Sequence, residues 1–288
     1  MTRLGTVAIV GAGQIGTLIG SALMAAGSQA GITSIGLFDI DPGVANLAFA
    51  SGAGDRLLSH CESVLEADVV ILAMPVGEII GWLAGFGPRL HEDQLLLDTG
   101  SAKTAVVAAM REHVNPAVRA LGGHPIAGNE ASGPAAAEPG ALTGATFVLT
   151  PVRPDPVAIQ LASQLVTACG AVALVMDAGT HDRLVARTSH LPHLVSSALA
   201  RLAVGDGNEL IQTRALAGGG YRSSTRLAAS NPGMVAGFLE ANHKEVRAAF
   251  EDFRRELDYL IEALARGPDA LEAGLEAGRA GRAAVLGD

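Results

Sequence analysis

The stretch Thr6-Val7-Ala8-Ile9-Val10-Gly11-Ala12-Gly13-Gln14-Ile15-Gly16 decides the fold of the first half of this 288-residue chain. Its first five residues are apolar or β-branched, which is typical of a buried parallel strand. The glycines follow at the spacing Gly-x-Gly-x-x-Gly, and a helix is predicted from about Thr17 to Ala26. We expect Gly11 to permit a tight turn, Gly13 to let backbone approach a pyrophosphate, and Gly16 to let helix pack on strand.

The residues around this loop indicate a dinucleotide site. A glycine-rich turn without a ligand is the alternative, since the chain contains 36 glycines and chance matches are expected. A second strand, residues 35–38, ends in Asp39, whose carboxylate can accept hydrogen bonds from ribose hydroxyls and would repel a 2′-phosphate. Residues 40–54 contain no Lys or Arg, so NAD is favoured over NADP. The predicted cofactor-binding residues are Gly11, Ala12, Gly13, Gln14, Ile15, Gly16, Asp39, Ala73, Met74 and Pro75.

Strands and helices continue to alternate through the first half of the chain. Further strands are predicted at residues 68–73, 95–98, 145–150 and 172–176, with a helix near 157–168. The pattern indicates an α/β fold with one doubly wound, mostly parallel (Rossmann-like) sheet. Met74 follows the strand 68–73, where it either fills the core or contacts the cofactor.

After residue 177 the strand patterns stop and an all-helical region follows. Helices are predicted at 181–204 with a bend at Pro192, at 210–217, at 232–266, and from Pro268 onward. We therefore expect a dinucleotide-binding domain at 1–177 and a helical domain for substrate binding and dimerisation at 178–288. Apolar positions exposed on such long helices are expected to be covered by a second copy, which predicts a homodimer.

The composition excludes several classes of protein. Hydrophobic residues make up 49% of the chain and charged residues 17%, so a large core can form. A net charge of −9 argues against nucleic-acid binding, and no apolar run approaches the roughly 20 residues of a membrane span. The two cysteines, Cys61 and Cys169, lie far apart, and no signal-peptide pattern opens the chain. We expect a cytoplasmic enzyme that binds neither nucleic acid nor membrane.

His124 is the main catalytic candidate. It stands between Gly123 and Pro125, so we expect it to lie outside any regular helix or strand and to reach into a cleft. An imidazole titrates near neutral pH and can accept a proton there. Ser101 is either a helix N-cap or a hydroxyl that contacts substrate. Lys103 either contacts substrate or lies solvated in a first helical turn, and it is left out of the catalytic set.

Five segments together resemble the prephenate/arogenate dehydrogenase family of tyrosine biosynthesis. They occur in the family's order over nearly the whole chain, and the two histidine-containing segments together are specific to it. They are Gly11–Gly16, Asp98–Lys103, Gly123–Pro134, Ser189–His193, and Gly219 through Arg226 to Pro232.

The resemblance implies a reaction and roles for residues. The reaction is NAD-dependent oxidative decarboxylation of a cyclohexadienyl substrate, in which aromatisation drives the loss of CO₂. His124 would accept the proton of the ring hydroxyl and Ser101 would share that hydroxyl. Arg226 would bind a carboxylate, for which a planar guanidinium is suited, and His193 and Glu130 would line the substrate end. The family also implies an intertwined dimer of the helical halves.

The chain departs from the family pattern beside the substrate. Ser223 stands where many members carry an acidic residue, and the tryptophan often found after the Asn231-Pro232 position is absent. Prephenate, arogenate and a 4-amino analogue of secondary metabolism therefore all stay open as substrates. A different dehydrogenase on the same plan, of the 6-phosphogluconate or imine-reducing kind, and a non-catalytic NAD-sensing module are the rival functions.

Several polar residues have simpler interpretations. His190 and His193 lie three residues apart on a helix, but no acidic residue or cysteine completes a metal site, so no metal is expected. One of the two is interpreted as a hydrogen-bonded core histidine, and His193 as the residue of the pocket. His181 with Asp182 is interpreted as a charged helix start. Arg222 and Glu130 both have surface solvation as the alternative to a functional role.

Overall fold

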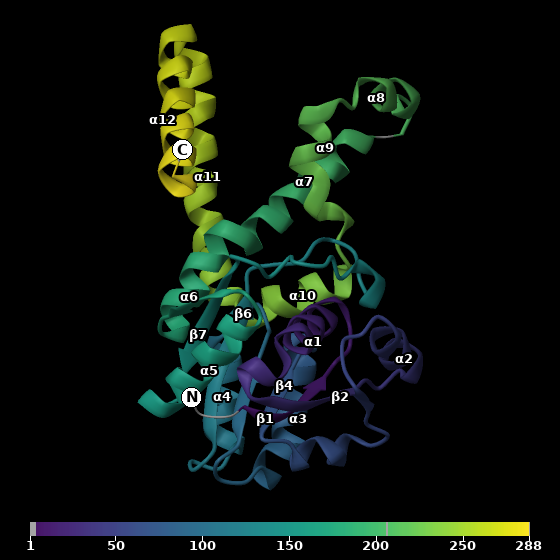
Figure 1. The fold of residues 1–288 in the computed structure, drawn as a ribbon. Helices are drawn as coiled ribbons and strands as arrows, with labels where there is room; N and C mark the ends of the chain where they lie inside the picture. The colour runs from purple at the N-terminus through teal and green to yellow at the C-terminus, as the bar shows by residue number, and fades with distance from the viewer. Residues whose placement is uncertain (1–3, 206, 288) are drawn as a thin grey trace. The chain divides into compact units, whose positions relative to one another are not determined.

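The computed structural model describes residues 4–205 and 207–287. The chain forms two compact units, Met1–His243 and Lys244–Asp288. The first unit contains every residue predicted for cofactor and substrate. The second is a pair of helices (Figure 1).

One eight-stranded sheet organises the first unit, in the strand order β3-β2-β1-β4-β5-β6-β7-β8. All neighbouring strands are parallel except β6 and β7, which are antiparallel. The doubly wound, mostly parallel sheet is confirmed. Its strands are β1 (Gly5–Val10), β2 (Ile32–Phe38), β3 (Arg56–Leu57), β4 (Val69–Leu72), β5 (Leu95–Asp98), β6 (Arg119–Pro125), β7 (Thr146–Pro151) and β8 (Val172–Val175).

Helices cover both faces of the sheet, which explains why the central strands β4 and β5 are buried at every position. One core cluster includes Ile9, Leu97 and Phe147 with residues of α1 and α5. The other includes Leu72 and Trp82 with residues of α3 and α4. The helices of this part of the chain are α1 (Gln14–Ala26), α2 (Pro42–Ala50), α3 (Val76–Phe86), α4 (Thr104–His113) and α5 (Pro156–Ala168).

Strand β6 corrects the expectation that His124 lies outside regular structure. His124 is the second-last residue of β6 and pairs in register with Val148. Gly122 and Gly123 belong to this strand. They must be glycine there, because neighbouring groups leave no room for a side chain at either position. A Cβ on Gly123 would lie 2.3 Å from the Asp98 carbonyl oxygen, and one on Gly122 would lie 2.3 Å from Thr150 Oγ1. Glycine in this strand thus permits close approach rather than a turn.

The helical region begins with one nearly continuous segment after β8. It consists of α6 (Ala178–Val185), a π-helical stretch (Ala186–His190) and α7 (Leu191–Val204). The sequence predicted a bend at Pro192, and the irregular stretch ends two residues before it. Short helices follow: α8 (Leu210–Leu216), α9 (Gly219–Thr225) and the 3₁₀ turn η6 (Arg226–Ala229).

The predicted single helix over 232–266 is wrong, because the chain breaks at Asn242. Helix α10 (Pro232–Ala241) ends there, and α11 (His243–Arg266) begins at the next residue. Asn242 has non-helical backbone angles of φ −115° and ψ 24°. Its side-chain amide donates to the Asp182 carbonyl oxygen at 2.8 Å and contacts His190 Nδ1 at 3.1 Å. These tertiary bonds outweigh the local preference for a continuous helix.

The second unit is a helical hairpin of α11 and α12 (Pro268–Leu286), which lie side by side in Figure 1. Gly267 makes the turn with φ +114°. A Cβ on Gly274 would lie 3.0 Å from Leu260 Cδ2, so the two helices pack closely at that point. Within the part of the chain that the structure describes, no helix is both long and apolar enough to cross a membrane.

Candidate functional site

The three glycines of the β1–α1 loop differ in what surrounds them. A Cβ on Gly11 would lie 2.4 Å from the Ala73 carbonyl oxygen, and Gly11 has φ +93°. A Cβ on Gly16 would lie 1.9 Å from the Gly11 carbonyl oxygen. A Cβ on Gly13 would meet no atom within 4 Å. Gly11 and Gly16 are therefore needed by the fold itself, whereas the open side of Gly13 fits a pyrophosphate at the start of α1.

Asp39 lies directly after β2 and holds the same loop in place. Its Oδ2 accepts a hydrogen bond from the Ala12 amide at 2.8 Å, and its Oδ1 accepts one from the Asp41 amide at 2.9 Å. A carboxylate has about four lone-pair sites, so acceptor capacity remains for ribose hydroxyls. The residues present fit a dinucleotide.

The β4–α3 junction borders the glycine loop. The Ala73 amide donates to the Val10 carbonyl oxygen at 2.7 Å, and Pro75 is the N-cap residue of α3. Met74 packs partly buried against the core cluster that includes Leu72. The structure therefore accounts for Met74 as a core residue, and Ala73 and Pro75 lie at the sheet edge where the cofactor is expected.

A hydrogen-bonded series of side chains ends at His124. His124 Nδ1 lies 2.8 Å from His181 Nε2, and His181 Nδ1 lies 2.8 Å from Asp182 Oδ1. Asp182 Oδ1 accepts from the Lys103 amide at 2.7 Å, and Asp182 Oδ2 accepts from the Thr104 amide at 2.8 Å. The interpretation of His181 and Asp182 as a charged helix start is wrong, because each is only 1% exposed.

Asp182 belongs to α6, and its carboxylate caps the N-terminus of a different helix, α4. Helix α4 has Lys103 as its N-cap residue, and no side chain of its own caps it. The N-cap alternative for Ser101 is therefore excluded. Ser101 lies partly buried in the loop between β5 and α4, two residues before Lys103. A carboxylate at a helix N-terminus satisfies free amides and interacts favourably with the helix dipole.

Lys103 is fully buried, which corrects both interpretations given for it. Its ammonium pairs with the buried Asp98 and donates to the Gly123 carbonyl oxygen at 2.7 Å. Asp98 Oδ1 in turn accepts from the Gly123 amide at 3.0 Å. The Asp98–Lys103 pair thus holds both backbone groups of Gly123, the residue before His124.

The loop after His124 contacts both the cofactor loop and the helical region. Gln14 Nε2 donates to Asn129 Oδ1 at 2.7 Å and to the Ala136 carbonyl oxygen at 3.0 Å. One residue further on, Glu130 forms an ion pair with Arg226 of η6. The Arg226 side chain remains 60% exposed. Arg226 is therefore brought to the segment that carries His124, with part of its guanidinium open to a ligand.

His190 and His193 both contact the ring of Phe238 in α10. The His190 ring stacks on Phe238 with centroids 4.7 Å apart, and the His193 ring meets it edge-on at 5.4 Å. His190 is fully buried and contacts Asn242, as expected for a core histidine. His193 is partly buried, and its Nδ1 has no hydrogen-bond partner among the residues that the structure describes. Among the described residues, no group of three or more His, Cys, Asp or Glu side chains is placed to bind a metal.

Burial shifts the pKa values of this region. Burial lowers the pKa of His124 well below its usual value, and nearby His181, Lys103 and His190 lower it further, while Asp182 opposes them. Burial lowers the pKa of His190 to about 4. Burial alone would raise the pKa of Asp182, but hydrogen bonds from His181, Thr104 and Lys103 bring it below the usual value. His124 is therefore neutral, and Asp182 ionised, at neutral pH.

Sequence reasoning did not assign a role to four residues of the buried hydrogen-bonded network of this region: Asp98, His181, Asp182 and Asn242. Asp98 is the last residue of a strand, and His181-Asp182 follows shortly after the last strand. Both positions lie at element ends, where functional groups concentrate. Asn242 gave no signal, because an asparagine is acceptable on a helix surface.

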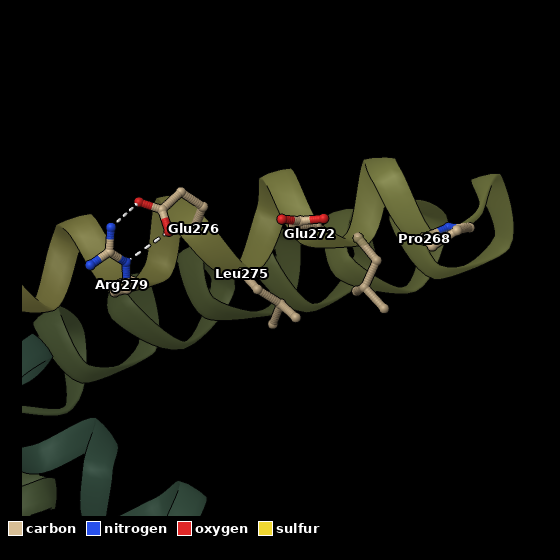
Figure 2. A pocket seen from close by; sticks show the side chains of 6 residues that line it. Pro268, Glu272, Leu275, Glu276 and Arg279 are labelled. Carbon is tan, nitrogen blue, oxygen red and sulfur yellow. Dashed lines mark hydrogen bonds and ion pairs between the residues drawn. The ribbon is translucent and has the colours of Figure 1, made fainter.

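Two surface hollows occur elsewhere in the molecule. One lies along α12, where Figure 2 shows Leu275 and Glu272 beside Glu276, which accepts two hydrogen bonds from Arg279. The other is lined by the end of α1, by the 3₁₀ turn Gly27–Ala30 that contains Gln29, and by α5, which contains Gln164. Neither is lined by a residue predicted for cofactor or substrate binding.

Comparison with known proteins shows that two domain models of one family match this chain. Residues 19–175 match the family model described as prephenate dehydrogenase, nucleotide-binding domain, and residues 177–275 match prephenate dehydrogenase, dimerization domain. The chain is 32% identical to a prephenate dehydrogenase of Bacillus subtilis over 256 residues, which cover 88% of this chain and 68% of that one.

Two further relatives extend the comparison. A cyclohexadienyl dehydrogenase of Zymomonas mobilis is 30% identical over 268 residues, 92% of this chain and 90% of that one. The crystal structure of prephenate dehydrogenase from A. aeolicus in complex with hydroxyphenyl propionate and NAD⁺ superposes with a TM-score of 0.89, covers 99% of each chain and is 27% identical. The chain belongs to the prephenate dehydrogenase family of NAD-dependent oxidoreductases, as the sequence predicts.

Proposed function

We propose that this protein catalyses the NAD-dependent oxidative decarboxylation of prephenate or a close cyclohexadienyl analogue. The observation that carries the proposal is the placement of His124 at the end of β6, with Nδ1 hydrogen-bonded, in the same unit as a glycine loop that fits a dinucleotide. The activities named for the B. subtilis and Z. mobilis relatives support this substrate class.

The loop Gly11–Gly16 and Asp39 would hold NAD, with Ala73, Met74 and Pro75 at the neighbouring sheet edge. When bound, the nicotinamide accepts a hydride from the ring carbon that bears the hydroxyl. His124 Nε2 accepts the hydroxyl proton as the hydride leaves. After CO₂ departs from the quaternary carbon, the same proton returns to the phenolate oxygen of the aromatic product. His124 thus ends the cycle neutral, as its lowered pKa favours.

The remaining residues orient the substrate. Ser101, in the loop at the end of β5, shares the ring hydroxyl with His124. Arg226 binds a substrate carboxylate through its exposed guanidinium, for which it exchanges part of its contact with Glu130. His193 and Glu130 line the substrate end. Holding the ring in one orientation is the main contribution of these groups, because aromatisation supplies the driving force.

We infer a division of labour at residue 177, with residues 1–177 for the cofactor and 178–288 for substrate binding and dimerisation. The helical hairpin supports a homodimer, because it exposes large apolar side chains. Ile261, Leu264 and Leu275 are each more than half exposed. Leu275 lies in the hollow of Figure 2, beside the Glu276–Arg279 pair.

The test is turnover with prephenate, arogenate and 4-amino-4-deoxyprephenate in turn, followed as NADH formation. The His124→Ala variant should lower kcat by roughly 10²–10⁴ with little change in the Kd for NAD. Arg226→Ala should mainly raise KM for the cyclohexadienyl substrate. Binding of NAD without turnover of any of the three compounds would contradict the proposal and favour an NAD-sensing module.

A further inference from the structure

A buried hydrogen-bonded series connects the first turn of α4 to His124. It runs from the Lys103 and Thr104 amides to the Asp182 carboxylate, then to His181, and then to His124, with the two atoms of each hydrogen bond 2.7–2.8 Å apart. His181 and Asp182 have no direct place in the proton and hydride transfers described above. Both are nonetheless 1% exposed, which is unusual for ionisable residues without a structural or functional partner.

With His181 neutral, the hydrogen-bonding capacity of each group determines where the protons lie. The two backbone amides can only donate, so Asp182 accepts at both oxygens. An ionised carboxylate is acceptor-only, so His181 Nδ1 must donate to it. The other nitrogen of a neutral imidazole is an acceptor, which makes His181 Nε2 the acceptor for His124 Nδ1–H. The remaining nitrogen of His124, Nε2, is then left with its lone pair free.

We propose that His181 and Asp182 are positioning residues that select the Nδ1–H tautomer of His124, so that unprotonated Nε2 faces the substrate hydroxyl. This inference rests on the proposed function only in giving His124 the role of proton acceptor. A His124 with the opposite tautomer would present an N–H to the hydroxyl and would have no base to offer. The same hydrogen bond stabilises the imidazolium that forms when Nε2 takes the proton.

Two sets of contacts position His124: one holds its neighbouring backbone and the other holds its ring. Only the contact with the ring can select the tautomer. The Asp98–Lys103 pair fixes the backbone of Gly123, which sets the position of His124. The charged or titratable groups near enough to shift the pKa of His124 are His181, Lys103, His190 and Asp182. Of these, His181 makes the hydrogen bond to the ring of His124 that the structure describes. The tautomer is therefore expected to depend on residue 181.

A pair of substitutions at His181 separates positioning from packing. In His181→Gln, the side-chain oxygen can still accept from His124 Nδ1–H, while in His181→Phe a ring of similar size offers no acceptor. We expect His181→Phe to lower kcat by roughly 10²-fold with KM little changed, and His181→Gln to recover most of that loss. If both variants lose activity equally, or neither does, the proposal is overturned.

The tautomer is measured directly on the protein without substrate. Long-range ¹H–¹⁵N correlation spectra of ¹⁵N-histidine-labelled protein distinguish protonated from unprotonated ring nitrogens, and a His124→Gln spectrum identifies the signals of His124 among the eight histidines. We expect His124 to be protonated at Nδ1 in the parent and in His181→Gln, and to lose that preference in His181→Phe.

The spectra keep this inference separate from the proposed function. An Nε2–H tautomer in the parent protein would overturn the inference even if prephenate were turned over. An Nδ1–H tautomer that is lost only in His181→Phe would support it even if none of the three cyclohexadienyl compounds were the substrate. If His181→Phe failed to fold, the parent spectrum and the His181→Gln variant would still decide.

Discussion

Gln14 Nε2 donates to Asn129 Oδ1 at 2.7 Å, which joins the dinucleotide loop to the loop that follows His124. The two residues are separated by most of the first half of the chain, and the bond forms between the proposed cofactor loop and a loop proposed to line the substrate. Gly128 supports this contact with φ +103°, since a Cβ there would lie 2.7 Å from Gln14 Oε1.

Replacing Gln14 by alanine should weaken substrate binding more than it weakens the fold. The contact is partly exposed, so the loss is expected to be about 1 kcal/mol, equivalent to about fivefold in KM for the cyclohexadienyl substrate. Steady-state kinetics at saturating NAD measures this change. Gln14→Glu, which keeps the length but not the amide donor, serves as the matched variant. An unchanged KM in both would show that the link does not order the loop.

Gly13→Ala should abolish tight NAD binding without destabilising the protein. The added methyl group meets no atom within 4 Å and Gly13 has an ordinary φ of −67°, so the fold accepts it. The pyrophosphate, however, would meet the methyl group. Calorimetric titration with NAD and thermal unfolding measure the two effects. Gly16→Ala is the contrasting variant, because its Cβ would lie 1.9 Å from the Gly11 carbonyl oxygen and should lower Tm.

Lys103→Met should be strongly destabilising. It leaves the carboxylate of Asp98 buried without its cation, which costs roughly 3–5 kcal/mol. Urea unfolding of the parent, Lys103→Met, Asp98→Asn and the double variant gives the coupling between the two sites. We expect the double variant to be more stable than Lys103→Met alone. A loss below about 1 kcal/mol in the single variant would contradict a buried ion pair.

The protein should lose stability as the pH falls from about 6.5 to about 4. His190 has its pKa lowered from 6.5 to about 4, so between these values the unfolded chain binds a proton that the folded chain does not. Its contribution is therefore present above pH 6.5 and is lost on acidification, by roughly 3 kcal/mol in total. His124 and His193 act in the same direction, because burial lowers their pKa values too.

His190→Gln tests how much of this pH dependence comes from His190, because glutamine does not titrate and can still accept a hydrogen bond from Asn242. The difference in free energy of unfolding between pH 7 and pH 5 should be smaller in this variant than in the parent. His60→Gln, at an exposed position, is the matched control substitution. Equal pH dependence in His190→Gln and the parent would contradict the role of His190.

The sequence was sufficient for the parts of the fold in which one pattern dominates. Continuous apolar runs ending in Gly, Asp or Pro predicted β1, β2, β4 and β5, and the glycine spacing predicted the loop before α1. Strand β6 was missed, because Gly123 and Pro125 were interpreted as residues that keep His124 outside regular structure. Gly123 is instead a strand residue, because close packing against Asp98 requires glycine there. The two-residue β3 carries too short a pattern to be identified.

The surroundings of the site depended on contacts between distant residues, which local patterns do not contain. His181 and Asp182 look like an ordinary helix start until α4 is placed beside them. Lys103 looks solvated until Asp98 and Gly123 enclose it. The break at Asn242 arises from bonds to Asp182 and His190, and so from tertiary structure alone.

Helix α4 belongs to the cofactor half of the chain, yet the carboxylate that caps it lies beyond residue 177. A cofactor half recombined with a different helical partner would keep its NAD loop, but its α4 amides and His124 would lack their acceptors. The helical region can therefore be exchanged for another only if His181 and Asp182, which follow residue 177, are kept. A chimera that retains residues 178–182 should tolerate more variation downstream than one joined at 177.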